Sequence, residues 1–183
     1  MAIDSWHFPR DELARRVLRL LIDGPGTALA LFAPRRTGKT EFLSFDLAPV
    51  ADKLRHRVIY VSFWEAPASP LAVLLHALEG SLRKGSWTDR VRDNAVALAP
   101  KLRLSAPLPG TNAEAEIDLG ALKAEVPSEL LLYLGDLIAR VANDRRPTLL
   151  MLDEVQELAR DSGNRPLIAA LRTALDTNKA GLR

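Results

Sequence analysis

The chain has 183 residues, of which 48% are hydrophobic and 26% are charged, fractions that exclude collagen-like and wholly disordered proteins. It contains no cysteine, which excludes a disulfide scaffold, a cysteine nucleophile and a thiolate metal site. The formal net charge of +2 is too small to argue for a nucleic-acid or membrane partner. The opening residues include Asp4 and no apolar signal-peptide core, and no apolar run is long enough to span a bilayer. We therefore expect a cytoplasmic protein without membrane contact.

The first third of the chain alternates helical and strand patterns. Residues 11–22 are predicted as an amphipathic helix that the Gly-Pro-Gly of residues 24–26 ends. Four side chains are expected on its buried face: Leu13, Val17, Leu20 and Leu21. The apolar run 27–33 is predicted as a strand buried on both faces of a parallel sheet. A helix over residues 38–54, perturbed near Pro49, is expected to follow.

A second strand is predicted over residues 57–64, where β-branched and aromatic residues gather. A helix over 69–83 follows, with Ser69 at its N-cap and Pro70 at its first position. Helical spacing continues over 87–99.

The later part of the chain has a less regular start and then clear patterns. Residues 101–104 and 114–119 flank a turn rich in Pro and Gly, which indicates either a β-hairpin or a loose loop. Ser128 is predicted to cap a helix that runs to about residue 143. A third buried strand over 148–152 and a last helix over 166–178 complete the pattern. Alternating strands and helices predict an α/β fold around a mainly parallel sheet.

The strongest motif spans residues 33–40, Ala-Pro-Arg-Arg-Thr-Gly-Lys-Thr, between a predicted strand and a predicted helix. It matches the Walker A pattern G-x-x-x-x-G-K-[ST] except at its first position, Ala33. In such a loop backbone N–H groups wrap phosphates, lysine places its charge on the β- and γ-phosphates, and the threonine hydroxyl is offered to Mg²⁺. The residues expected to bind nucleotide are Pro34, Arg35, Arg36, Thr37, Gly38, Lys39, Thr40 and Glu41.

Two details of this loop stay open at the level of sequence. Ala33 is strained if the turn needs a positive φ and costs little if φ is negative. Arg35 and Arg36 are either solvated loop residues or contacts to phosphate or to a neighbouring domain.

A second motif follows the third predicted strand, where four apolar residues run into Asp153 and Glu154. In an open parallel sheet the ligand crevice lies at the carboxyl ends of the strands, so Lys39 and Asp153 are expected to face one nucleotide. Asp153 is predicted to hold Mg²⁺ beside Thr40. Glu154 is predicted to act as the general base or to position the attacking water.

These motifs resemble those of P-loop ATPases of the AAA+/STAND kind. APRRTGKTEF and LLMLDEVQEL are most similar to prokaryotic ATPase families with "G-P-R-R-x-G-K-T" and "L-D-E-h-Q" motifs. The opening HFPRDEL of residues 7–13 resembles the Phe–Arg–Glu–Leu element that begins such domains and packs near the adenine. The resemblance implies a three-layer αβα P-loop NTPase fold, with ATP and Mg²⁺ as cofactors and Lys39 and Glu154 as catalytic residues. It also implies an accessory role for Gln156 near the γ-phosphate, the alternative being an exposed helix position.

The resemblance further implies that residues 1–183 are the N-terminal part of a longer ATPase domain. The stretch between the two motifs is longer than a minimal core needs, so an insertion is expected at about residues 85–126. In this family another strand, the sensor-1 strand, lies between the phosphate-loop strand and the Asp-Glu strand. That strand and a C-terminal domain are expected beyond residue 183, where a protein or DNA partner would bind. Oligomerisation is compatible with this scheme.

The leading functional prediction is Mg²⁺-dependent ATP hydrolysis coupled to conformational change. The alternative is a regulatory ATP-binding switch with little turnover, acting through DNA- or protein-binding regions elsewhere. Small-molecule phosphotransfer is a weaker third reading, because no acceptor pocket or Arg-rich lid is recognisable. ATP is favoured over GTP by the resemblance and by the absence of a guanine-specifying N-K-x-D motif.

Overall fold

The computed structural model describes residues 7–26, 28–34, 36–64, 69–82 and 127–183, together with the backbone of 101–103 and 116–118. The α-helices are α1 (Asp11–Asp23), α2 (Lys39–Glu41), α3 (Ala48–Lys53), α4 (Pro70–Leu82), α6 (Ser128–Ala142) and α7 (Arg165–Thr177). A π-helix, η1 (Phe42–Leu47), joins α2 to α3, and two 3-10 helices, η3 (Val155–Arg160) and η4 (Ser162–Asn164), precede α7. The strands are β1 (Arg57–Ser62), β2 (Lys101–Arg103), β3 (Glu116–Asp118) and β4 (Thr148–Asp153).

The central sheet is formed by β1 and β4, which run parallel from the pair Arg57–Thr148 to the pair Ser62–Asp153. The other edge of β4 carries one further parallel bridge, between Thr148 and Leu182. There the backbone N–H of Arg183 donates to the Thr148 carbonyl at 2.8 Å. The sheet formed by β1 and β4 is parallel, as the alternation of strands and helices predicted.

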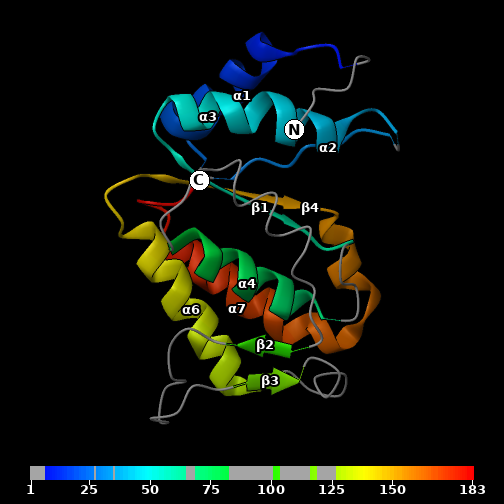
Figure 1. Cartoon of the computed structure of the whole chain (residues 1–183), viewed down its shortest axis with the longest axis vertical. Coiled ribbons are helices and arrows are strands. Elements are labelled where there is room, and N and C mark those ends of the chain that lie inside the picture. Colours follow the sequence, from blue (N-terminus) through cyan, green and yellow to red (C-terminus); the bar gives the residue numbers. More distant parts are fainter. Residues whose placement is uncertain are drawn as a thin grey trace.

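Helices cover both faces of this sheet, so the α/β layering is confirmed (Figure 1). On one face α1, η1 and α3 pack against Val58, Leu149 and Met151. On the other face α4, α6 and α7 pack against Ile59 and Val61. Because both faces are buried, successive strand residues are apolar and show no alternation.

The predicted strand over residues 27–33 is wrong for the part that the structure describes. Residues 28–34 form no strand and are exposed; Phe32 is 93% exposed. A strand forms only where its backbone N–H and C=O groups find a neighbouring strand. In the described part of the chain, β1 and β4 pair with each other and leave this segment without a ladder. The expected sensor-1 strand between it and β4 stays a prediction.

Helix α1 occupies the predicted residues, but its buried face differs from the predicted one. The buried side chains are Ala14, Val17, Leu18 and Leu21. Leu13 and Leu20 are about half exposed, at 49% and 59%. The four buried positions follow the i, i+3, i+4, i+7 spacing of one helix face, to which Ala14 belongs although it is small.

The helix predicted over 38–54 is present in three parts rather than one. Its middle, η1, is a π-helix that ends two residues before Pro49. Proline has no N–H and cannot bond to the carbonyl four residues earlier, at Phe45. The π-helical turn therefore lies just before the proline, where the backbone N–H of residue 49 is missing.

The remaining described α-helices and strands are of the predicted type. Helix α6 begins at Ser128, but Pro127 is its N-cap and the cap receives no side-chain hydrogen bond, so the predicted Ser128 cap is wrong. Strands β2 and β3 pair antiparallel, as the β-hairpin alternative predicted. The helix predicted over 87–99 and most of the insertion predicted at 85–126 lie outside the described residues. Within the described ranges, no helix combines the length and the apolar character required to cross a membrane.

Candidate functional site

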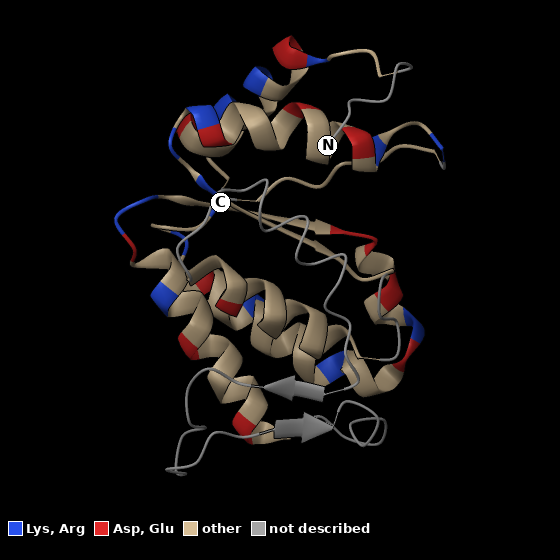
Figure 2. Ribbon diagram, viewed as in Figure 1, with Lys and Arg blue, Asp and Glu red and all other residues tan. Residues whose placement is uncertain are grey.

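The loop before α2 and the carboxyl ends of β1 and β4 lie on the same side of the molecule (Figure 1). Figure 2 shows basic residues in this loop and acidic residues at the end of β4 and just beyond it. Basic and acidic residues of the two sequence motifs thus lie on the same side of the molecule.

The backbone of the loop turns through two residues with positive φ. Arg36 has φ of 62° and Gly38 has φ of 76°. Ala33 is not among the described residues with positive φ, so its Cβ costs little at the position where the motif has glycine. A turn built from left-handed residues directs successive N–H groups to one side and can form an anion-binding concavity.

Lys39 closes this loop from the first turn of the helix. Its ammonium group donates to the carbonyls of Ala33 and Pro34, at 2.8 and 3.0 Å. The Thr37 hydroxyl also donates to the Pro34 carbonyl, at 2.8 Å. These bonds hold the two ends of the loop together and keep the ammonium inside it.

Asp153 is the point where the two motifs meet. Its Oδ2 accepts the Thr40 hydroxyl at 2.7 Å, although the two residues are 113 positions apart. The same oxygen accepts the Tyr60 hydroxyl at 2.9 Å, and Oδ1 accepts the backbone N–H of Glu154 at 2.9 Å. Asp153 is only 6% exposed, so these donors compensate a carboxylate that has lost most of its water.

Glu154 directly follows this strand end in an unusual backbone conformation. Its φ of 54° and ψ of 40° are left-handed, which is uncommon for a residue other than glycine, and strain of this kind clusters at functional sites. The turn directs the chain from β4 into η3. The Gln156 side-chain amide donates to Oε2 of Glu154, so Gln156 contacts the predicted base.

The Thr40 hydroxyl and the Asp153 carboxylate are oxygen groups of the type that Mg²⁺ takes as ligands, and they lie 2.7 Å apart. They would hold the ion directly or through a bound water. No cluster of three metal-binding side chains occurs within the described ranges. Mg²⁺ does not need one, since it keeps waters and takes phosphate oxygens as further ligands.

The predicted site residues thus differ in how they are placed. Thr40 and Asp153 are in contact, and Lys39 lies within its loop. Arg36 and Glu41 are exposed, and Arg35 lies outside the described residues. Prediction from sequence missed Tyr60, whose hydroxyl reaches Asp153 from the neighbouring strand. The only signal was a phenol within the apolar run of β1.

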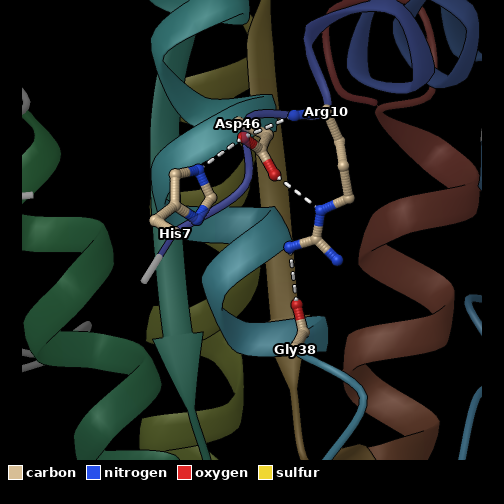
Figure 3. A network of polar contacts seen from close by, with 4 residues as sticks. All are labelled: His7, Arg10, Gly38 and Asp46. Carbon is tan, nitrogen blue, oxygen red and sulfur yellow. Dashed lines mark hydrogen bonds and ion pairs between the residues drawn. The ribbon is translucent and has the colours of Figure 1, made fainter. Parts of the chain in front are cut away.

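Prediction from sequence also missed Asp46, which lies in η1 behind the loop. It is 1% exposed and bonds to both His7 and Arg10, and Arg10 donates in turn to the Gly38 carbonyl (Figure 3). A usable signal was present, because an aspartate between Phe45 and Leu47 on a buried helix face needs partners.

The chain matches no protein-family model, no curated protein and no solved structure. The contacts of the loop, Tyr60 and Asp153 are therefore the observations from which a function can be proposed.

Proposed function

We propose that this chain binds ATP with Mg²⁺ at the loop of residues 33–40 and Asp153, and hydrolyses it, so that nucleotide state is coupled to conformational change. The observation that carries the proposal is the 2.7 Å contact between the Thr40 hydroxyl and the Asp153 carboxylate. Neither motif is specific alone, but a Walker-type loop and an acidic strand end that meet in space form the pair that Mg²⁺–phosphate binding requires.

Each residue has a role that follows from its chemistry. The backbone N–H groups of the loop bind phosphate oxygens, and Lys39 supplies a positive charge there. Thr40 and Asp153 hold Mg²⁺, which when bound neutralises charge on the phosphate oxygens. Tyr60 and the Glu154 N–H orient the Asp153 carboxylate.

Glu154 is the residue proposed to accept the proton of the attacking water. It lies next to Asp153 in the chain, and its strained backbone turns it out of the strand. Gln156 donates to one of its oxygens and so orients the carboxylate.

A second candidate function follows from that same contact. The Gln156 amide occupies Oε2 of Glu154, so that oxygen does not contact an attacking water while the bond lasts. A chain in which Glu154 stays bonded to Gln156 would bind ATP and turn it over slowly, as a regulatory switch does.

Calorimetry of ATP binding with Mg²⁺ and with EDTA tests the nucleotide site. We expect Lys39→Ala to weaken binding at least tenfold, the order of effect of a lost charge-assisted contact. Lys53→Ala is the matched control, because Lys53 is exposed at the end of α3. Equal affinities of the Lys39→Ala variant and the unsubstituted chain would refute the proposal.

Phosphate release then separates hydrolysis from the switch. Turnover that Glu154→Gln lowers by about 10²-fold or more supports Glu154 as the base, within the range typical of general-base catalysis. Equal turnover in both proteins removes Glu154 from that role. Tight binding with no turnover in the unsubstituted chain selects the switch.

A further inference from the structure

Behind the phosphate loop, Asp46 organises a set of polar contacts that the proposed chemistry does not use (Figure 3). Its Oδ1 accepts the His7 ring nitrogen at 2.9 Å and the backbone N–H of Arg10 at 3.1 Å. Its Oδ2 accepts Nε of Arg10 at 2.9 Å. A carboxylate that is 1% exposed needs such compensation, so residues 7–10 are held where Asp46 requires them.

Arg10 extends these contacts to the loop itself. While Nε bonds to Asp46, a terminal nitrogen of the same guanidinium donates to the Gly38 carbonyl at 3.1 Å. The guanidinium also lies over the Phe42 ring, 5.3 Å from its centroid. Because the guanidinium is planar and rigid, fixing Nε on Asp46 fixes the direction in which the terminal nitrogen points.

Gly38 is the residue on which the geometry of the loop depends. It has φ of 76° and directly precedes Lys39 and Thr40. Its carbonyl accepts Phe42 N–H, the first bond of the helical run, as well as the arginine. A Cβ on Gly38 would lie 3.4 Å from Nη1 of Arg10, so the guanidinium packs directly against this backbone.

We infer that Arg10 and Asp46 are positioning residues for the phosphate loop. Asp46 fixes Arg10, and Arg10 holds the Gly38 carbonyl, so that Lys39 and Thr40 start the helix in the orientation that phosphate binding needs. The inference rests on the proposed function. The docking of residues 7–10 strengthens phosphate binding in the loop by some factor. Because coupling between two equilibria is reciprocal, phosphate binding strengthens this docking by the same factor. Residues 7–10 therefore report whether the loop is occupied.

The test measures ATP affinity, with Mg²⁺, for Arg10→Gln, Asp46→Asn and the double variant. We expect each single substitution to weaken binding roughly tenfold, the scale of one charge-assisted hydrogen bond. We expect the double variant to bind about as weakly as the weaker single one, because both changes break one chain of contacts.

The matched controls remove an ion pair at the far end of the same helical run. Asp52 and Arg146 are paired at 3.4 Å near the start of β1. Asp52→Asn and Arg146→Gln are expected to leave ATP affinity unchanged. If Asp46→Asn does not fold, the ATP affinities of Arg10→Gln and Arg10→Lys test the inference. Arg10 is partly exposed, so its substitution should leave the chain folded. Lysine keeps the positive charge but lacks the rigid planar fork that reaches both Asp46 and the Gly38 carbonyl, so the ATP affinity of Arg10→Lys should lie between those of the unsubstituted chain and Arg10→Gln.

Hydrogen exchange distinguishes positioning from a general loss of stability. In the unsubstituted chain saturating ATP should slow exchange of the Arg10 amide, which donates to Asp46. In Arg10→Gln, saturating ATP should still slow the amides of residues 36–40 but protect the amide of residue 10 much less.

The outcomes separate the two proposals. If the unsubstituted chain and Lys39→Ala bind ATP equally, the proposed function fails. If Lys39→Ala loses binding while Arg10→Gln, Arg10→Lys and Asp46→Asn bind as the unsubstituted chain does, the nucleotide site stands and the positioning role is overturned. Additive effects of Arg10→Gln and Asp46→Asn also overturn it.

Discussion

Replacing Tyr60 with phenylalanine removes one hydroxyl from the site and leaves the ring in the sheet. The hydroxyl donates to Asp153 Oδ2 at 2.9 Å. A hydrogen bond to a charged group contributes ~1.5–3 kcal/mol. Asp153 keeps two other donors, the Thr40 hydroxyl and the Glu154 N–H, so the loss should lie near the lower limit. We expect the free energy of unfolding, measured with urea, to fall by ~1.5 kcal/mol.

The same substitution should weaken Mg²⁺-dependent ATP binding about tenfold, since groups that orient a metal ligand carry effects of that size. Calorimetry with Mg²⁺ and with EDTA isolates the metal-dependent part. The matched control is Tyr133→Phe. The Tyr133 hydroxyl donates to Glu79 at 2.7 Å between α4 and α6, and both residues are buried.

Tyr133→Phe should cost comparable stability and leave ATP binding unchanged. Equal changes of ATP affinity in the two variants would refute the role assigned to Tyr60. An unaltered free energy of unfolding in Tyr60→Phe would refute the assigned hydrogen bond.

Three further predictions concern the fold. Leu134→Ala in α6, at a fully buried position, should lower the free energy of unfolding by ~2–5 kcal/mol, whereas Leu132→Ala, at a position 65% exposed, should change it by less than ~0.5 kcal/mol; urea titration compares them. Burial lowers the pKa of His56, so the neutral form is favoured in the folded chain and the unfolded chain takes up the proton first. Stability should therefore fall as pH drops below about 6.5, and His56→Gln should flatten this slope in melts between pH 7 and 5. Gly38→Ala should cost ~1–2 kcal/mol because φ is positive there; a melting temperature equal to that of the unsubstituted chain would contradict the assigned backbone.

The sequence predicted the helices, whose contacts are local, and the two strands that are buried on both faces. The run 57–64 contains β1, and 148–152 contains all of β4 but its last residue, because a strand buried on both faces is apolar throughout. The run 27–33 is also apolar but forms no strand over its described residues. The difference is the neighbouring strand, which is a property of the sheet and is not written in the segment itself.

In the candidate site, the residues within sequence motifs were predictable and the residues outside them were not. Thr40 and Asp153 were predictable as neighbours because a Walker-type loop and an acidic strand end commonly share one ligand, although residues 28–34 before the loop form no strand. Tyr60 and Asp46 act across space, from a strand and a helix with no motif of their own. Their roles depend on which residues face one another across strands and helices, and residue spacing alone does not show this.

The π-helix η1 has a consequence for how the chain tolerates changes in length. A π-turn accommodates one residue more than an α-helical turn, so η1 decouples the loop-facing start of the run from the core-facing α3. Deleting a single residue other than Asp46 within 42–47 removes that extra residue, so the helix can become regular while its two halves keep their orientations. In a regular helix such as α6, the same deletion rotates all following residues by about 100° and moves buried side chains out of the core. A one-residue deletion should therefore be better tolerated in η1 than in α6.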